Sequence, residues 1–145
     1  MMKLIEFGSR YSFYDWFWRG KRSDNYPLIE LNYRHCWEED THIYRATENG
    51  KDVGIIFISC CNPGEMWIDL FEIREGYCNK GLGTEMFKLL IEKHKPEYIK
   101  LQCVEERDDE ALSFWRKMGF HKKRNSGYYD NLMYKNISKK YWKNV

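Results

Sequence analysis

A glycine-bearing segment between an apolar run and an amphipathic run is the part of this sequence best suited to chemistry. Residues 76–84 read Gly-Tyr-Cys-Asn-Lys-Gly-Leu-Gly-Thr, and a helix is expected to begin near Gly81. The first N–H groups of an α-helix have no partner inside the helix, and glycines let a ligand approach the backbone closely. Because the helix dipole also favours negative charge there, the segment predicts a site for a phosphate or pyrophosphate.

Two other phosphate-binding motifs fail on this segment. A P-loop needs a lysine directly after the second glycine of its G-x-x-x-x-G spacing, and Leu82 stands there. A dinucleotide-binding fingerprint needs a third glycine where Met86 stands, and the strands expected upstream form hairpins instead of a βαβ unit. The pattern that remains is x-x-x-G-x-G between a strand and a helix.

A second motif lies about one expected helix and one expected strand further along the chain. Residues 108–120 read D-x-x-A-x-x-F-W-x-x-x-G-F. Together with residues 78–83, which stand where [QR]-x-x-G-x-[GA] is usual, this motif resembles the GNAT superfamily of acyl-CoA-dependent N-acyltransferases. The resemblance follows the order of elements over residues 41–136 and is specific over residues 67–120, whereas the first 40 residues match nothing in the family pattern.

The resemblance implies a mixed α/β fold, in which a mostly antiparallel central sheet is flanked by helices and splays apart between two central strands. Acyl-CoA would lie in the gap. The backbone of the third strand would pair with the pantetheine arm and polarise the thioester, and the loop N–H groups would hold the pyrophosphate. N–H donors aimed at a developing oxyanion are worth roughly 3–4 kcal/mol each in acyl transfer. The cofactor-binding residues implied in this way are Phe71, Glu72, Ile73, Cys78, Asn79, Lys80, Gly81, Leu82, Gly83, Thr84, Asp108 and Trp115.

Three positions depart from the family pattern. Cys78 replaces a Gln or Arg, so Lys80 or Arg74 must supply the positive charge at the loop. Asp108 replaces the usual Asn and can still cap the helix, although its charge is unfavourable near phosphates. Trp115 stands where the family commonly has the tyrosine that protonates the leaving thiolate, and an indole N–H cannot serve as that acid.

Three explanations for the missing acid stay open. The thiolate leaves unaided, because a thiol pKa of about 8.5 makes it a tolerable leaving group. Alternatively, Tyr128 or Tyr129 of the expected last strands supplies the proton. In the third explanation the site is catalytically weak.

Asp69 is the candidate for the base that deprotonates the attacking amine. In the expected third strand it shares a face with Trp67, Phe71 and Ile73. Apolar neighbours of this kind can raise the pKa of a carboxyl group toward the range in which it accepts a proton from an amine.

The elements that must position these residues follow from the apolar patterns and the turn residues. The expected strands cover residues 41–47, 53–61, 66–73, 98–104, 120–124 and 128–136. The expected helices cover an aromatic-rich segment at 9–20, a segment from Gly81 to Pro96, and a segment from 108 to Gly119. Asn49-Gly50 predicts a tight hairpin between the first two of these strands.

The composition is that of a globular domain with a core. Of the 145 residues, 43% are apolar and 17% aromatic, which excludes a disordered polar chain. The net charge of +2 favours neither nucleic acid nor an anionic membrane surface as a partner. Five cysteines without a C-x-x-C pair and four dispersed histidines predict no disulfide framework and no metal site. Neither a signal peptide nor a membrane span is expected, and free thiols predict a cytoplasmic protein.

These observations predict a single domain over residues 1–145, with an acceptor side over about 1–40 and an acyl-CoA-binding core over about 66–120. The expected function is an acetyl-CoA-dependent N-acetyltransferase, in which a primary amine attacks the thioester directly. The alternative is a CoA-binding regulatory or interaction module without turnover. The identity of the amine stays open, and edge strands after Asn125 permit a homodimer. The aromatic residues expected to wall the acceptor pocket are Tyr11, Tyr14, Trp16, Trp18 and Trp37.

Overall fold

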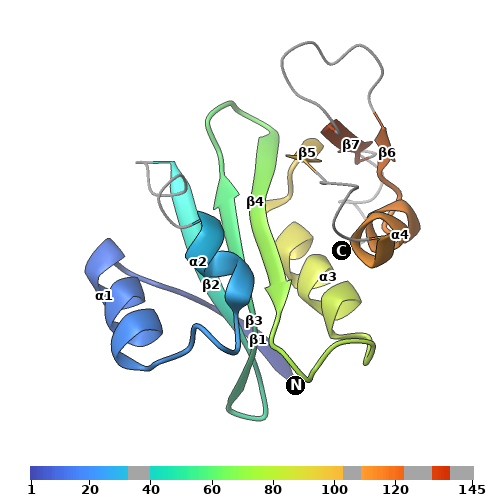
Figure 1. Cartoon of the computed structure of the whole chain (residues 1–145). Helices are drawn as coiled ribbons and strands as arrows, with labels where there is room; N and C mark the ends of the chain where they lie inside the picture. Colours follow the sequence, from blue (N-terminus) through green and yellow to red (C-terminus); the bar gives the residue numbers. More distant parts are fainter. Residues whose placement is uncertain (33–39, 103–108, 123–131, 138–145) are drawn as a thin grey trace. The chain divides into compact units, whose positions relative to one another are not determined.

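The computed structural model of the chain describes residues 1–32, 40–102, 109–122 and 132–137 (Figure 1). The chain divides into two compact units. The first, here the N-terminal unit, comprises Met1–Ser59 and Asp69–His94. The second, the C-terminal unit, comprises Cys60–Ile68 and Lys95–Val145. The single domain expected from the sequence stays a prediction.

Seven strands of the described chain form one mixed sheet in the order β1-β2-β3-β4-β5-β7-β6. Strand β2 pairs antiparallel with β1 and β3, and β7 pairs antiparallel with β5 and β6. Strands β4 and β5 pair in parallel, with Glu65–Ile68 opposite Tyr98–Leu101. This mixed α/β sheet confirms the predicted fold class, while the splaying of the two central strands stays a prediction. The strand bounds are β1 Met2–Glu6, β2 Thr41–Glu48, β3 Lys51–Ser59, β4 Glu65–Ile73, β5 Tyr98–Gln102, β6 His121–Lys122 and β7 Leu132–Asn136.

In the second half of the chain the helices lie where the apolar patterns predict them. In the first half the structure contains one helix that these patterns did not predict. The expected helix over 9–20 is present, but its second half is a π-helix. One short helix of six residues, α2, was not expected, and neither was strand β1. The helix bounds are α1 Arg10–Tyr14, the π-helix η1 Asp15–Arg19, α2 Pro27–Asn32, α3 Leu82–His94 and α4 Asp109–Lys117.

The hairpin of β2 and β3 turns where the sequence predicts it. Asn49 and Gly50 have φ angles of 52° and 81°, in the left-handed region that a tight two-residue hairpin turn requires. A register shift between Ala46 and Thr47 marks an irregularity in the pairing near the turn. The last two expected strands correspond in part to β6 and β7, and residues 123–131 between them lie outside the described chain.

The core of the N-terminal unit places β4 between the helices of the first 32 residues and α3. A cluster of buried side chains joins α1, η1 and α2 to one face of β2, β3 and β4. On the other face, a Cβ added at Gly54 of β3 would lie 2.4 Å from the sulfur of Met86 in α3. Helices therefore cover both faces of this part of the sheet. The cluster consists of Phe13, Phe17, Tyr26, Ile29, Ile43, Ile55, Phe57 and Leu70.

The C-terminal unit contains its own polar and aromatic packing around the paired part of β4 and β5. Glu65 Oε1 accepts a hydrogen bond from Trp67 Nε1 at 2.7 Å and lies 3.0 Å from Lys100 Nζ, while Glu65 Oε2 accepts a hydrogen bond from Asn62 at 3.2 Å. The Lys100 ammonium also lies 5.4 Å from the centre of the Trp67 ring. These contacts hold the parallel strands in register. Within the described ranges no helix is long and apolar enough to cross a membrane.

Candidate functional site

The segment that follows β4 is built from backbone conformations that favour glycine. Gly76, Asn79 and Gly81 have φ angles of 88°, 63° and 77°. The carbonyl of Gly81 accepts a hydrogen bond from the N–H of Glu85 at 3.3 Å, so α3 begins directly after Gly81. The N–H groups of residues 82–84 therefore belong to the first helical turn, in which a helix offers no carbonyl partners of its own. The predicted entry into a helix is confirmed.

The surroundings of Gly81 leave room for a ligand against the backbone. Apart from Gly81 itself and its two neighbours in the chain, no heavy atom of the described residues lies within 4 Å of the position that a Cβ would take there. Gly81 and the three residues before it are exposed. An open backbone at the start of a 13-residue helix fits a pyrophosphate-bearing ligand, because both the N–H groups and the helix dipole favour an anion. A side chain at this position would occupy the same space.

The two cations available to this loop have different surroundings. Both stack on the ring of Tyr77, with Arg74 Cζ 5.3 Å and Lys80 Nζ 5.4 Å from its centre. Arg74 also donates a hydrogen bond of 3.2 Å to the backbone carbonyl of Asp52 in the hairpin. Lys80 is exposed. Of the two cations expected to compensate for Cys78, Lys80 is therefore the more accessible to solvent.

Strand β4 has one buried face and one less buried face. The expected base, Asp69, lies with Trp67 and Phe71 on the less buried face and is itself exposed. Ser59 Oγ of β3 donates a hydrogen bond of 2.5 Å to Asp69 Oδ2. The apolar neighbours on this face therefore do not enclose the carboxylate, and a hydroxyl group orients it instead.

The buried face of β4 carries a carboxylate that the sequence pattern did not single out. The side chain of Glu72 is 6% exposed, and its Oε2 accepts a hydrogen bond of 3.0 Å from the N–H of Leu28 in the first turn of α2. Burial raises the pKa of Glu72 to about 7, the N–H groups of Leu28 and Ile29 oppose this rise, and the charge of Glu75 adds to it. The sequence implied a role only for the backbone of Glu72. The sequence signal that could have indicated its burial is the two-residue spacing from Leu70, which places both side chains on the buried face of β4.

Of the remaining residues expected to bind the cofactor or act as the acid, the structure describes Trp115, which is packed in the core. Trp115 is 7% exposed and packs edge-on against Phe114 and Phe120, with ring centres 4.9 Å and 5.2 Å away. This is the arrangement of a core tryptophan at the end of α4. Asp108, Tyr128 and Tyr129 lie outside the described residues, so their expected roles stay predictions.

The aromatic residues of the acceptor side do not all face the same environment. Tyr11 and Trp18 are 68% and 42% exposed, and their expected place in the wall of an acceptor pocket stays a prediction. Tyr14 and Trp16 instead pack against the core cluster of the N-terminal unit. Trp37 lies outside the described residues.

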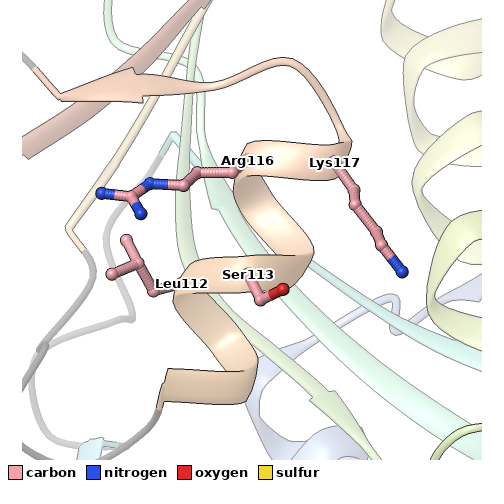
Figure 2. A pocket seen from close by; sticks show the side chains of 4 residues that line it. All are labelled: Leu112, Ser113, Arg116 and Lys117. Carbon is pink, nitrogen blue, oxygen red and sulfur yellow. The ribbon is translucent and has the colours of Figure 1, made fainter.

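A surface hollow of about 550 Å³ lies against α4 (Figure 2). It is lined by Leu112, Ser113, Arg116 and Lys117. Figure 2 shows the Arg116 and Lys117 side chains pointing away from each other, so the two cations do not converge on one anion. Among the residues that the structure describes, no group of three or more His, Cys, Asp and Glu side chains could hold a metal ion.

Solved structures of several bacterial acetyltransferases have the same fold as this chain. The ribosomal-protein-S18-alanine N-acetyltransferase of Escherichia coli superposes with a TM-score of 0.69 at 17% identity, over 95% of each chain. A Bacillus subtilis acetyltransferase in complex with CoA has a TM-score of 0.64 at 16% identity, over 95% of this chain and 100% of that one. A GNAT family acetyltransferase from Elizabethkingia anophelis with acetyl-CoA bound has a TM-score of 0.61 at 14% identity, over 94% of this chain and 98% of that one.

Sequence comparison gives a more specific result than these structural likenesses. No curated protein sequence matches the chain significantly. The model of the acetyltransferase (GNAT) family, however, matches residues 10–120, which include the glycine loop, β4, β5 and α4. The chain therefore belongs to the GNAT family of acetyltransferases.

Proposed function

We propose that this chain is an acetyl-CoA-dependent N-acetyltransferase that acts on a primary amine. The observation that carries the proposal is the entry into α3, where Gly81 has a φ of 77° and leaves open space beside N–H groups that suit a pyrophosphate. Membership of the GNAT family supports it, as do the acetyl-CoA and CoA held by two proteins of the same fold. The odd number of cysteines, with no C-x-x-C pair among them, supports a reducing cytoplasm as its compartment.

The proposed reaction is a direct attack of the amine nitrogen on the thioester carbonyl. A bond forms between nitrogen and the acetyl carbon, the carbon–sulfur bond breaks, the amine loses a proton, and the CoA thiolate gains one. The backbone of Phe71, Glu72 and Ile73 would align the pantetheine arm, and the N–H groups of residues 78–84 would hold the pyrophosphate. In this assignment the protein supplies alignment and hydrogen-bond donors.

The proton transfers are assigned to one residue of β4 and to two tyrosines outside the described residues. Asp69 is proposed as the base, acting on the amine directly or through a water molecule, with its carboxylate oriented by Ser59. The proton for the thiolate comes from Tyr128 or Tyr129, or from solvent after unaided departure. Trp115 takes no part as an acid, because an indole N–H does not give up its proton near neutral pH.

The decisive experiment combines a binding titration with an acceptor screen. Purified protein is titrated calorimetrically with acetyl-CoA, and is then incubated with acetyl-CoA and representative primary amines: an aminoglycoside, a polyamine, an amino acid, a peptide N-terminus and a lysine peptide. We expect binding and acetylation of at least one class, detected by thiol release and by mass spectrometry. Absence of acetyl-CoA binding would refute the proposed acetyltransferase function.

A CoA-binding module without turnover is the second candidate, and the packing of Trp115 favours it. That tryptophan fills the position of the usual acid and is buried against Phe120. The same experiment separates the two functions. Binding of acetyl-CoA with no acetyl loss in the presence of any of the five amine classes would favour the module.

Substitution of Asp69 tests the proposed base. In Asp69→Asn the amide cannot accept the proton from the amine, so we expect kcat to fall about 100-fold while the Kd of acetyl-CoA is unchanged. Ser59→Ala serves as the matched control, because it removes the orienting hydrogen bond but keeps the carboxylate, and its kcat should fall less than tenfold. A kcat and pH profile of Asp69→Asn equal to those of the wild type would exclude Asp69 as the base.

A further inference from the structure

Backbone and side-chain bonds tie the segment before and within α2 to the end of β4. Glu72 Oε2 accepts a hydrogen bond from the N–H of Leu28, 44 residues earlier in the chain. Three residues after Glu72, the N–H of Glu75 donates to the carbonyl of Asn25 at 2.9 Å. Because α2 has only six residues, it is too short to be stable through its own hydrogen bonds. Its position therefore depends on these contacts and on the burial of Ile29 in the core cluster.

The Glu72 carboxylate is the buried part of this connection. Its side chain is 6% exposed, and in the described part of the chain its Oε1 has no hydrogen-bond partner. The hydroxyl of Tyr26, just before α2, is likewise buried without a partner. The charge on Glu72 is therefore balanced chiefly by the two N–H groups at the start of α2.

The charged and titratable groups near Glu72 come from each segment packed around it. Glu75 acts on Glu72 directly and raises its pKa, and Glu72 in turn acts on Tyr26. The groups that surround Tyr26 are Asp52 of β3, Arg74 after β4, and Arg22 before α2. With a pKa of about 7, Glu72 exchanges its proton in the neutral pH range. Hydrogen bonds to an ionised acceptor are about twice as strong as those to a neutral one, so ionisation strengthens the bonds to Leu28 and Ile29.

We propose that Glu72 is a positioning residue, whose carboxylate fixes the start of α2 to the strand that would bind acyl-CoA and whose protonation loosens α2. The part that concerns the strand rests on the proposed function. In this arrangement the backbone of Glu72 faces the cofactor while its side chain orders the acceptor side. Binding of the cofactor along β4 would then order α2, which belongs to the segment expected to receive the amine.

The attachment of α2 through the Glu72 carboxylate is tested without any acceptor, by NMR of the ¹⁵N-labelled full chain between pH 5.5 and 8.5. In the wild type, the amide proton shifts of Leu28 and Ile29 should follow one titration with a midpoint near pH 7. In Glu72→Gln this titration should be absent. In Glu75→Gln, the control, it should persist with a lower midpoint, because the neighbouring charge that raises the pKa has been removed. Amide shifts that do not titrate in the wild type, or that titrate unchanged in Glu72→Gln, would overturn the proposal.

The coupling to the strand is tested by hydrogen exchange with CoA as the probe. At pH 7.5, saturation with CoA should slow exchange at Leu28 and Ile29 at least twofold in the wild type. In Glu72→Gln, measured at a CoA concentration that saturates the variant according to its own Kd, this slowing at Leu28 and Ile29 should be lost, which a purely structural role would not produce. Equal slowing in both proteins would overturn the coupling. If neither protein binds CoA, the proposed function fails. The wild-type pH titration still confirms or refutes, independently of CoA, that the Glu72 carboxylate holds α2.

Discussion

Acetyl-CoA binding is expected to be lost in Gly81→Glu, with the affinity falling at least about 100-fold, which corresponds to roughly 2.7 kcal/mol. Gly81 lies directly before α3, and in the part of the chain that the structure describes no heavy atom beyond its sequence neighbours lies within 4 Å of its Cβ position. A glutamate side chain would project into the space proposed for the pyrophosphate and would add a like charge to it. The change is measured by calorimetric titration of the purified variant with acetyl-CoA.

The chain offers a closely matched control for this substitution in Gly50. Its φ angle of 81° is close to the 77° of Gly81, and among the described residues no heavy atom beyond its sequence neighbours lies within 4 Å of its Cβ position either. Gly50→Glu therefore introduces a similar backbone strain and the same charge, but in the β2–β3 turn. We expect it to bind acetyl-CoA within twofold of the wild type. Equal loss of binding in both variants, or none in either, would show that the loop before α3 does not hold the pyrophosphate.

Glu72→Gln is expected to change how the stability of the protein depends on pH, by on the order of 3 kcal/mol. The folded-state pKa of Glu72, about 7, is above the ordinary value of 4.5. Between these values the folded chain binds more protons than the unfolded chain, so the free energy of unfolding falls as the pH rises from about 4.5 to 7. Glutamine does not titrate. The stability of the variant relative to the wild type should therefore increase over this pH range and then remain constant.

Urea unfolding at pH 5, 6, 7 and 8 measures this difference. Glu85→Gln is a suitable control, because Glu85 is an exposed glutamate of α3 and its replacement should leave the wild-type pH dependence almost unchanged. Curves of unfolding free energy against pH that run parallel for the wild type and Glu72→Gln would contradict the buried, proton-binding carboxylate.

Ionisation of Glu72 has opposite effects on the stability of the fold and on the attachment of α2. At pH 8 its charge lowers the stability of the fold, because an ionised carboxylate is buried with only backbone N–H groups to balance it. The same charge strengthens the attachment of α2 to β4. A buried group that costs stability while it orders a binding segment is the kind of exchange found at functional sites.

The features predicted correctly from the sequence are those whose cause lies within a few residues. Asn49-Gly50 adopts the left-handed backbone of a tight turn because these two residue types tolerate it best. The start of α3 after Gly81 and its end before Pro96 follow from glycine, proline and a 3.6-residue apolar spacing. The alternation of buried and less buried residues in β4 likewise follows from the geometry of a single strand.

The features that the sequence did not predict depend on partners far along the chain. Strand β1 exists through its pairing with β2, in which Leu4 lies opposite Ala46, and only its first residue is buried. Helix α2 depends on a carboxylate 44 residues away. The exposure of Asp69 and its hydrogen bond to Ser59 follow from how β3 and β4 meet, although the alternation correctly placed Asp69 on its face.

By itself, the sequence determined the mixed α/β class, the glycine entry into α3 and the family, because glycine conformation, helix capping and apolar periodicity are local properties. Only the tertiary structure decided the environments of the carboxylates and cations. Burial and hydrogen bonding depend on which segments pack together, so Glu72 is enclosed under α2, Asp69 is open to solvent, and Arg74 is bonded to the hairpin while Lys80 stays exposed beside the loop.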